Sequence, residues 1–177
     1  MNLRTRSLYS HGGQYFPVDI FGYVSHGTPG IEIVGMGKHS RAIKDKFVYL
    51  SRVRQLRLPK RRFVICVEGE IEGKKFKDEE YRYLEFPMLL VLWSLAGHLP
   101  FSNLDDCIST GKVSIDGDVD CLDLQKDLQN KFWDIFDLLS NEDIKVIAPD
   151  KMEIAEDFYH LSLEGIMKSL MPESELK

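Results

Sequence analysis

The spacing of apolar and polar positions predicts strands in the first third of the chain. Residues 16–24 are rich in β-branched and aromatic side chains, and residues 31–34 alternate between apolar and polar, as strands do. The turn-forming residues 25–30 lie between them and predict that the two strands pair as a hairpin. A further buried strand is predicted at residues 62–67, where the residues after Arg62 are all apolar.

Apolar residues at helical spacing predict two helices, and a continuous apolar run predicts a third. The first covers residues 38–54 and is followed by Leu58-Pro59, which is predicted to close it. The apolar run at residues 87–96 predicts a buried helix with Pro87 in its first turn and Gly97 after its end. An amphipathic helix follows residue 121. The apolar stripes of the first and last helices are Ile43, Phe47, Leu50 and Val53, and Leu124, Leu128, Phe132, Ile135 and Leu139.

The remaining segments mix strands, turns and helix. Residues 68–83 are polar and predict a long exposed connection. Residues 110–115 and 118–121 predict a hairpin around the two-residue turn Asp116-Gly117. Residues 144–148 predict a short strand, and a helical tail is expected from there to about residue 170. No internal repeat is present, so the pattern predicts one α+β domain over residues 1–177.

Composition places the chain among ordinary globular proteins. Its 177 residues are 44% hydrophobic and 29% charged, which is enough for a sizeable core. No apolar run approaches the roughly 18 residues of a membrane span, and the N-terminus lacks the apolar stretch of a signal peptide. The three widely spaced cysteines Cys66, Cys107 and Cys121 are typical of a reducing compartment. These features argue against membrane, secreted disulfide-rich and disordered classes, and predict a cytoplasmic location.

Charge is distributed unevenly along the chain. The formal net charge is −5, yet residues 38–62 hold ten basic side chains and one acidic one, whereas residues 100–177 hold seven basic and eighteen acidic ones. Such asymmetry indicates an anion-binding surface, two faces that meet in an oligomer, or solvated helix surfaces, and the pattern alone favours the last. The candidate nucleic-acid-binding residues are Arg52, Arg54, Arg57, Lys60, Arg61 and Arg62.

Motifs for cofactors and metals are incomplete. Gly35-Met36-Gly37 could cradle phosphate, but Ser40 replaces the third glycine of the dinucleotide fingerprint, so a tight strand-to-helix turn is predicted instead. No P-loop motif is present. The aspartates of residues 116–120 have calcium-loop spacing, which the predicted hairpin explains without a metal. The five histidines share no short spacing with cysteines. We therefore predict no cofactor, metal or nucleotide.

The order of several short motifs resembles the N-terminal domain of the ComM / magnesium-chelatase ChlI-like family. Residues 17–36, PVDIFGYVSHGTPGIEIVGM, are similar to the family's V-x-V-E-V-x-x-x-x-G-L-P-x-F-x-I-V-G-L-P. The sequences RVR at residues 52–54 and RFVI at residues 62–65 resemble its E-R-V-R-A-A-L and P-x-x-R-I-T-V segments. LEFPML at residues 84–89 and GKVSIDG at residues 111–117 resemble F-D-L-P-I-A and G-E-L-S-L-D-G. The resemblance spans about residues 8–170.

This resemblance implies a ribosomal protein S5 domain 2-like fold, a mixed sheet with helices packed on it, which is shared with the proteolytic domain of Lon-type peptidases. In ComM-like proteins the domain precedes an AAA+ ATPase module, and this sequence ends where that module would begin. Lon-like peptidases use a serine and a lysine, whose matching positions here are Met88 and Lys126. A thioether has no proton to give up and forms no acyl-enzyme. Ser94 lies six residues out of register.

The expected function is therefore a non-catalytic interaction or assembly domain, with a role accessory to DNA processing implied by the resemblance. The expected partner is a protein or a second copy of the chain, and no membrane is expected. One alternative is a nucleic-acid-binding domain that uses the basic segment at residues 38–62. The other is a degenerate Ser-Lys peptidase.

Overall fold

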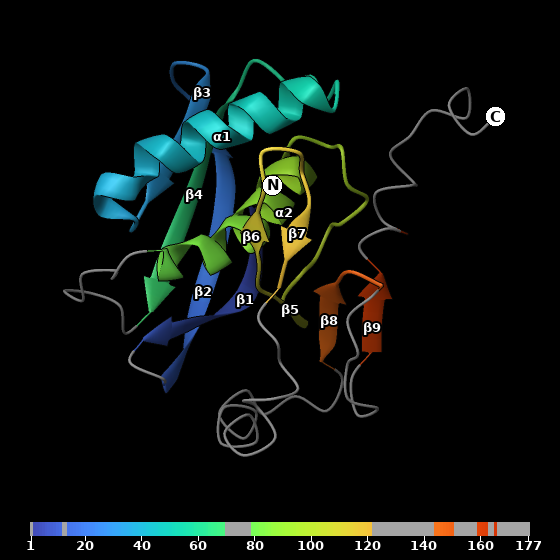
Figure 1. Ribbon diagram of the computed structural model, residues 1–177. Coiled ribbons are helices and arrows are strands. Elements are labelled where there is room, and N and C mark those ends of the chain that lie inside the picture. The colour runs from blue at the N-terminus through green and yellow to red at the C-terminus, as the bar shows by residue number, and fades with distance from the viewer. Residues whose placement is uncertain are drawn as a thin grey trace.

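The computed structural model describes residues 2–11, 14–69, 79–121, 144–150, 159–162 and 165. Within them, seven strands form one mixed sheet in the order β3-β4-β2-β1-β5-β8-β9 (Figure 1). A two-stranded sheet of β6 and β7 lies beside it. The protein is thus α+β, as predicted. The seven strands are β1 (Asn2–His11), β2 (Gln14–Ser25), β3 (Gly30–Val34), β4 (Arg62–Gly69), β5 (Cys107–Ser109), β8 (Lys145–Ala148) and β9 (Tyr159–Ser162).

The hydrophobic pattern did not predict the first strand, although β1 lies in the middle of the sheet. It pairs antiparallel with β2 over its whole length and parallel with β5. Its core-facing residues include the buried polar Thr5 and Ser7 between Leu3 and Tyr9. The hydroxyl of Thr5 donates to the carbonyl of Cys107 at 3.0 Å. These polar residues remove the alternation that identifies a strand from sequence.

The prediction that the strands at residues 16–24 and 31–34 pair with each other as a hairpin is wrong. β3 does not pair with β2, because β4 lies between them, antiparallel to β2 and parallel to β3. The parallel β3–β4 pair needs a crossover, and the chain supplies it with α1 (Ser40–Val53). Residues 25–30 therefore span the width of one strand rather than close a tight turn.

The turn between β3 and α1 is the tight strand-to-helix turn that the sequence predicted. Gly35 has φ of +91°, and a Cβ at this position would lie 2.3 Å from the carbonyl oxygen of Val67. Only glycine fits so close to the neighbouring backbone. Gly37 also has a positive φ, of +53°, but a Cβ there would meet nothing within 4 Å. It begins a short 3-10 helix, η1 (Gly37–His39), which leads into α1.

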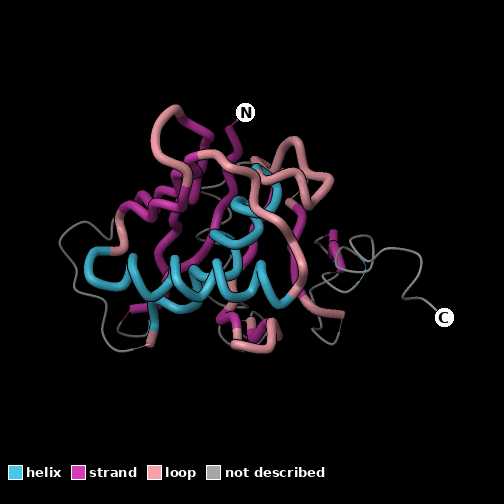
Figure 2. Tube along the Cα trace, turned by 90° about the horizontal axis from the view of Figure 1, so that it is seen from above, coloured by secondary structure: helices cyan, strands magenta, loops and turns pink. Residues whose placement is uncertain are grey.

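Two helices cover one face of the large sheet (Figure 2). α1 buries Ile43, Phe47 and Leu50, but Val53, predicted to continue this stripe, is 52% exposed because the helix ends there. α2 (Glu85–Leu95) is buried at every residue, as is typical of a helix that is apolar all round. It follows the 3-10 helix η2 (Glu80–Leu84) and is followed by Gly97, as predicted.

The close approach of α2 to the sheet depends on Gly22 of β2. A Cβ on this residue would lie 2.7 Å from side-chain atoms of both Ile65 and Val91. Gly22 thus faces α2, which fixes the direction of its neighbours. Because side chains alternate along a strand, Phe21 and Tyr23 point to the opposite face of the sheet.

The small sheet lies on the outer side of the two helices (Figure 1). β6 (Lys112–Val113) and β7 (Val119–Asp120) form the hairpin predicted for residues 110–121. Its turn is longer than the predicted two residues. The five residues 114–118 lie between the paired strands, where Ser114 donates its N–H to the carbonyl of Asp118, and Gly117, with φ of +88°, donates its N–H to the carbonyl of Ser114.

The predictions for the C-terminal part have different outcomes. The strand predicted at residues 144–148 is confirmed as β8. The helical tail is wrong at Tyr159–Ser162, which form strand β9 and pair parallel with β8. The amphipathic helix predicted after residue 121 and most of the connection at residues 68–83 lie outside the described residues. Among the helices that the structure describes, none is long and apolar enough to cross a membrane.

Candidate functional site

The basic segment continues from α1 into a connection to β4, and residues 52–62 are called the basic loop from here on. α1 ends at Val53, five residues before the predicted closing pair Leu58-Pro59. The reversal occurs at Gln55, which has φ of +57°, and the N–H of Leu56 donates to the carbonyl of Ser51 at 2.8 Å. A left-handed residue of this kind is a common end to a helix.

Apolar anchors and hydrogen bonds hold the basic loop in place. Leu56 and Leu58 are half-buried and pack against the core. The carbonyl of Arg57 is 3.0 Å from a ring nitrogen of His98, and the carbonyl of Arg61 accepts the N–H of Gly30 at 3.0 Å. The loop backbone is thereby tied to the segment after α2 and to the start of β3. The long basic side chains therefore extend from a backbone that is held in place at both of these points.

The structure divides the six candidate residues into two groups. Arg52, Arg57, Lys60 and Arg61 are exposed, and none of them makes an ion pair with a residue that the structure describes. Arg54 and Arg62 are held by the protein itself.

The guanidinium of Arg54 donates to the carbonyl of Asp116 at 3.3 Å, and that of Arg62 pairs with Glu32 at 2.5 Å. Four of the six candidates are therefore available to a ligand without breaking an ion pair or a side-chain hydrogen bond to a residue that the structure describes.

The other basic residues of the segment are directed elsewhere. Lys38 lies in η1 and Arg41 in the first turn of α1, and at 1.5 Å per residue Arg41 is about 16 Å along the helix axis from Arg52. Arg41 pairs with Asp45 at 3.8 Å, and Lys46 points inward. The ten basic side chains counted in the sequence thus do not form one surface. The exposed group that lies together in sequence is the basic loop.

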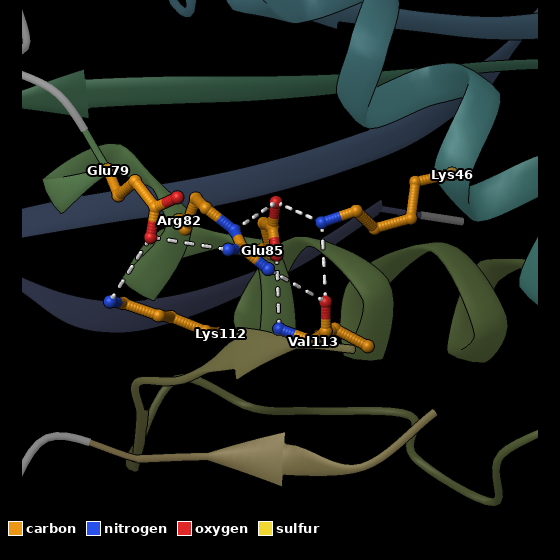
Figure 3. A network of polar contacts seen from close by, with 6 residues as sticks. All are labelled: Lys46, Glu79, Arg82, Glu85, Lys112 and Val113. Carbon is orange, nitrogen blue, oxygen red and sulfur yellow. Dashed lines mark hydrogen bonds and ion pairs between the residues drawn. The ribbon is translucent and has the colours of Figure 1, made fainter. Parts of the chain in front are cut away.

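A second polar feature, which the sequence did not predict, is centred on the buried carboxylate of Glu85 (Figure 3). Its side chain is 1% exposed, and one oxygen accepts from Lys46 at 2.5 Å while Arg82 lies 3.5 Å away. The other oxygen accepts the N–H of Val113 at 3.0 Å. Lys46 and Arg82 also donate to the carbonyl of Val113, at 3.2 Å and 3.4 Å.

The Glu85 network connects three parts of the fold. Lys46 comes from α1, Glu85 begins α2, and Val113 belongs to β6, so the network fixes the small hairpin against both helices. At its outer side Glu79 lies 3.4 Å from Arg82 and 3.9 Å from Lys112. A signal for it exists in the sequence, because Glu85 is the one charged residue in the run LEFPMLLVLWSLA at residues 84–96. The internal donors and acceptors that surround the carboxylate indicate a structural role.

The positions that match the peptidase dyad form no site among the described residues. Met88 is completely buried within α2. Ser94 is also buried, and its hydroxyl donates to the carbonyl of Leu90 at 2.6 Å. Lys126 lies outside the described residues. Across the described part of the chain, no group of three or more His, Cys, Asp or Glu side chains could hold a metal ion.

No protein-family model matches this chain, and a search of curated proteins finds no match.

Proposed function

We propose that this chain is a non-catalytic interaction domain that binds the phosphate backbone of nucleic acid through the basic loop. The observation that carries the proposal is the exposure of Arg52, Arg57, Lys60 and Arg61, which make no ion pair within the described part of the chain and project from a backbone held by the core. A cation that is already paired must lose one partner to gain another, whereas these four need not. Preorganisation lowers the entropy cost of binding.

The composition of the basic loop suits a polyanion such as a phosphate backbone. Residues 52–62 contain five arginines, one lysine and no acidic residue. The planar guanidinium can donate two parallel hydrogen bonds to a phosphate group, a geometry that the ammonium of lysine does not offer. Contacts of this type supply most of the sequence-independent affinity of proteins for DNA and RNA.

The family resemblance adds a proposed fold, location and role to this binding activity. We propose that the chain is related to the N-terminal domain of ComM-like ATPases, has the ribosomal S5 domain 2-like fold and acts in the cytoplasm as an accessory to DNA processing. The mixed sheet with two helices on one face supports the coarse part of this fold. The assembly role, with a protein partner or a second copy, belongs to the same proposal and depends on analogy between folds.

The test is a comparison of two triple charge reversals, measured by fluorescence anisotropy with labelled DNA at low salt. R57E/K60E/R61E reverses three exposed charges of the basic loop. K38E/R41E/K44E makes the same change in net charge at the other end of α1 and serves as the matched control. We expect the loop variant to weaken binding at least about tenfold and the control variant by less than about threefold. Equal losses in both variants, or no binding by the wild-type protein, would contradict the proposal.

A further inference from the structure

The face of the large sheet opposite α1 and α2 carries two aromatic side chains in line. Phe21 and Tyr23 of β2 both point to this face, which is turned away from the viewer in Figure 1. Phe21 is half-buried, and Tyr23 is 40% exposed. Their cross-strand partners are Arg4 and Asn2 on β1, and Cys66 and Val64 on β4. Among the described residues, Phe21 and Tyr23 thus form an aromatic strip along β2 on this face, where Leu8 of β1 and Val64 of β4 are buried.

This strip is bordered by a hollow of about 640 Å³. The hollow lies between the strands β1 and β2 and the loop after α2. Phe21, Tyr23 and Arg4 line it from the sheet, and Ser102, Asn103 and Asp105 line it from the loop. The site therefore combines aromatic side chains with Ser102, Asn103 and Asp105, which can hydrogen-bond a base edge, whereas the guanidinium of Arg4 is paired with Asp19.

The acidic side chains of this face are largely neutralised. Asp19 pairs with Arg4 at 2.7 Å and lies 4.0 Å from Arg6, and Glu32 pairs with Arg62 at 2.5 Å. Two further carboxylates of the described residues are Asp105 at the rim of the hollow and Glu68 near the far end of β4. Because the nearby carboxylates of Asp19 and Glu32 are already paired, they repel a polyanion less than free ones would.

The aromatic strip and the basic loop meet at the start of β4. Arg62, the last residue of the basic loop, is two residues before Val64, the partner of Tyr23, and so lies on the same face. At about 3.3 Å per residue along a strand, Arg62 and Val64 are about 7 Å apart. Lys60 and Arg61 precede this point, directly before β4 begins. These two exposed cations of the basic loop therefore come within four residues of Val64, the partner of Tyr23, while Arg62 itself is paired with Glu32.

We propose that the ligand of the basic loop is single-stranded nucleic acid, whose bases stack on Tyr23 and Phe21 while its phosphates contact the loop. This inference rests on the proposed function and adds the substrate class. A duplex offers its phosphates but keeps its bases stacked inside, whereas a single strand can place bases on aromatic rings. Stacking on an aromatic platform beside a basic groove is how proteins bind single strands with little sequence preference.

The test compares one labelled oligonucleotide, single-stranded and annealed to its complement, by fluorescence anisotropy with the full chain. We expect the single strand to bind tighter than the duplex. Tyr23→Ala should weaken single-strand binding about 5- to 150-fold and change duplex binding less than about twofold. Tyr23→Phe keeps the ring and should bind like the wild type. Tyr49→Ala removes a ring of similar exposure, 47%, from the outer side of α1 and should have no effect.

The outcomes separate this inference from the proposed function. Equal affinity for single strand and duplex, or a Tyr23→Ala variant that binds the single strand like the wild type, overturns the proposal that bases stack on the aromatic strip. Either result leaves the proposal that the basic loop binds phosphates unaffected. Failure of the wild type to bind either form overturns both. Unchanged circular dichroism and thermal unfolding of Tyr23→Ala show that a loss of binding is not a loss of folding.

Discussion

The Glu85 network makes a strong and specific prediction about stability. Replacing Glu85 by alanine leaves Lys46 and Arg82 without the carboxylate that lies 2.5 Å and 3.5 Å from them, and it leaves the buried N–H of Val113 without its acceptor. Removing one partner of a buried ion pair costs about 3–5 kcal/mol. The side chains of Lys46 and Arg82 are 23% and 26% exposed, so both can turn partly toward water. We therefore expect a loss of about 3 kcal/mol, at the low end of that range.

Two further variants separate the charge from the hydrogen bond. Glu85→Gln keeps an oxygen for the N–H of Val113 and nearly the same volume, so it should cost about 1–2 kcal/mol. Lys46→Met leaves the carboxylate with Arg82 at the longer distance and should cost about 2 kcal/mol. In the double variant of Lys46→Met and Glu85→Gln the charges are removed together, so its loss should be smaller than the sum of the single losses by about 1 kcal/mol.

Urea unfolding followed by circular dichroism measures these free energies, provided that the transition is two-state. A surface ion pair such as Arg41–Asp45, at 3.8 Å and highly exposed, provides the control, because Asp45→Ala should change the free energy of unfolding by less than about 0.5 kcal/mol. The reasoning would be refuted if Glu85→Ala cost less than about 1 kcal/mol, or if the double variant lost as much as the two single variants together.

Three other predictions concern the packing and titration of single residues. Gly35→Ala should destabilise the protein by more than about 3 kcal/mol, because the new Cβ meets the carbonyl of Val67, whereas Gly37→Ala should cost about 1 kcal/mol. Chemical denaturation compares the two variants, and equal losses would contradict the close approach of Gly35 to the backbone of β4. Burial raises the pKa of the Cys107 thiol to about 12, so this cysteine should resist alkylation until the protein unfolds. Mass spectrometry measures the labelling, and alkylated Cys107 in the native protein would contradict its burial. A hydrogen bond from Lys145 lowers the pKa of Asp106 below its ordinary value, so the carboxylate's contribution to stability is present above the unfolded pKa and is lost as the pH falls through the folded pKa. Asp106→Asn should therefore lower the free energy of unfolding by less than about 1 kcal/mol at neutral pH, because the pair is half-exposed, and by nothing in acid. A difference between wild type and variant that does not depend on pH would refute the assignment.

Local patterns predicted the elements whose side chains follow a simple period. α1 is apolar on one side, α2 is apolar all round, and β4 is a run of apolar residues, so each was identified within a few residues. β1 was missed because Thr5 and Ser7 face the core, where hydrogen bonding rather than hydrophobicity accommodates Thr5. Tertiary pairing overrode the pattern in this strand.

Strand pairing and the candidate site were less accessible from the sequence. The residues between β2 and β3 have turn chemistry, but turn chemistry does not report whether a third strand enters between its neighbours, as β4 does. The basic loop was found from charge alone. Its division into four exposed cations and the two held by Asp116 and Glu32 depends on contacts between residues 30 or more positions apart. Such contacts leave no local signal.

The most direct test of the central claim is the salt dependence of nucleic-acid binding by the wild-type protein and the loop variant R57E/K60E/R61E. Four exposed cations that each neutralise one phosphate of a single strand predict a slope of about −3 for log K against log salt concentration, from about 0.7 per contact. The loop variant keeps only Arg52 of the four cations, so it should bind weakly with a slope of about −0.7, while K38E/R41E/K44E keeps the wild-type slope. A wild-type affinity that does not change with salt, or a loop variant that keeps both the affinity and the slope, would contradict the account.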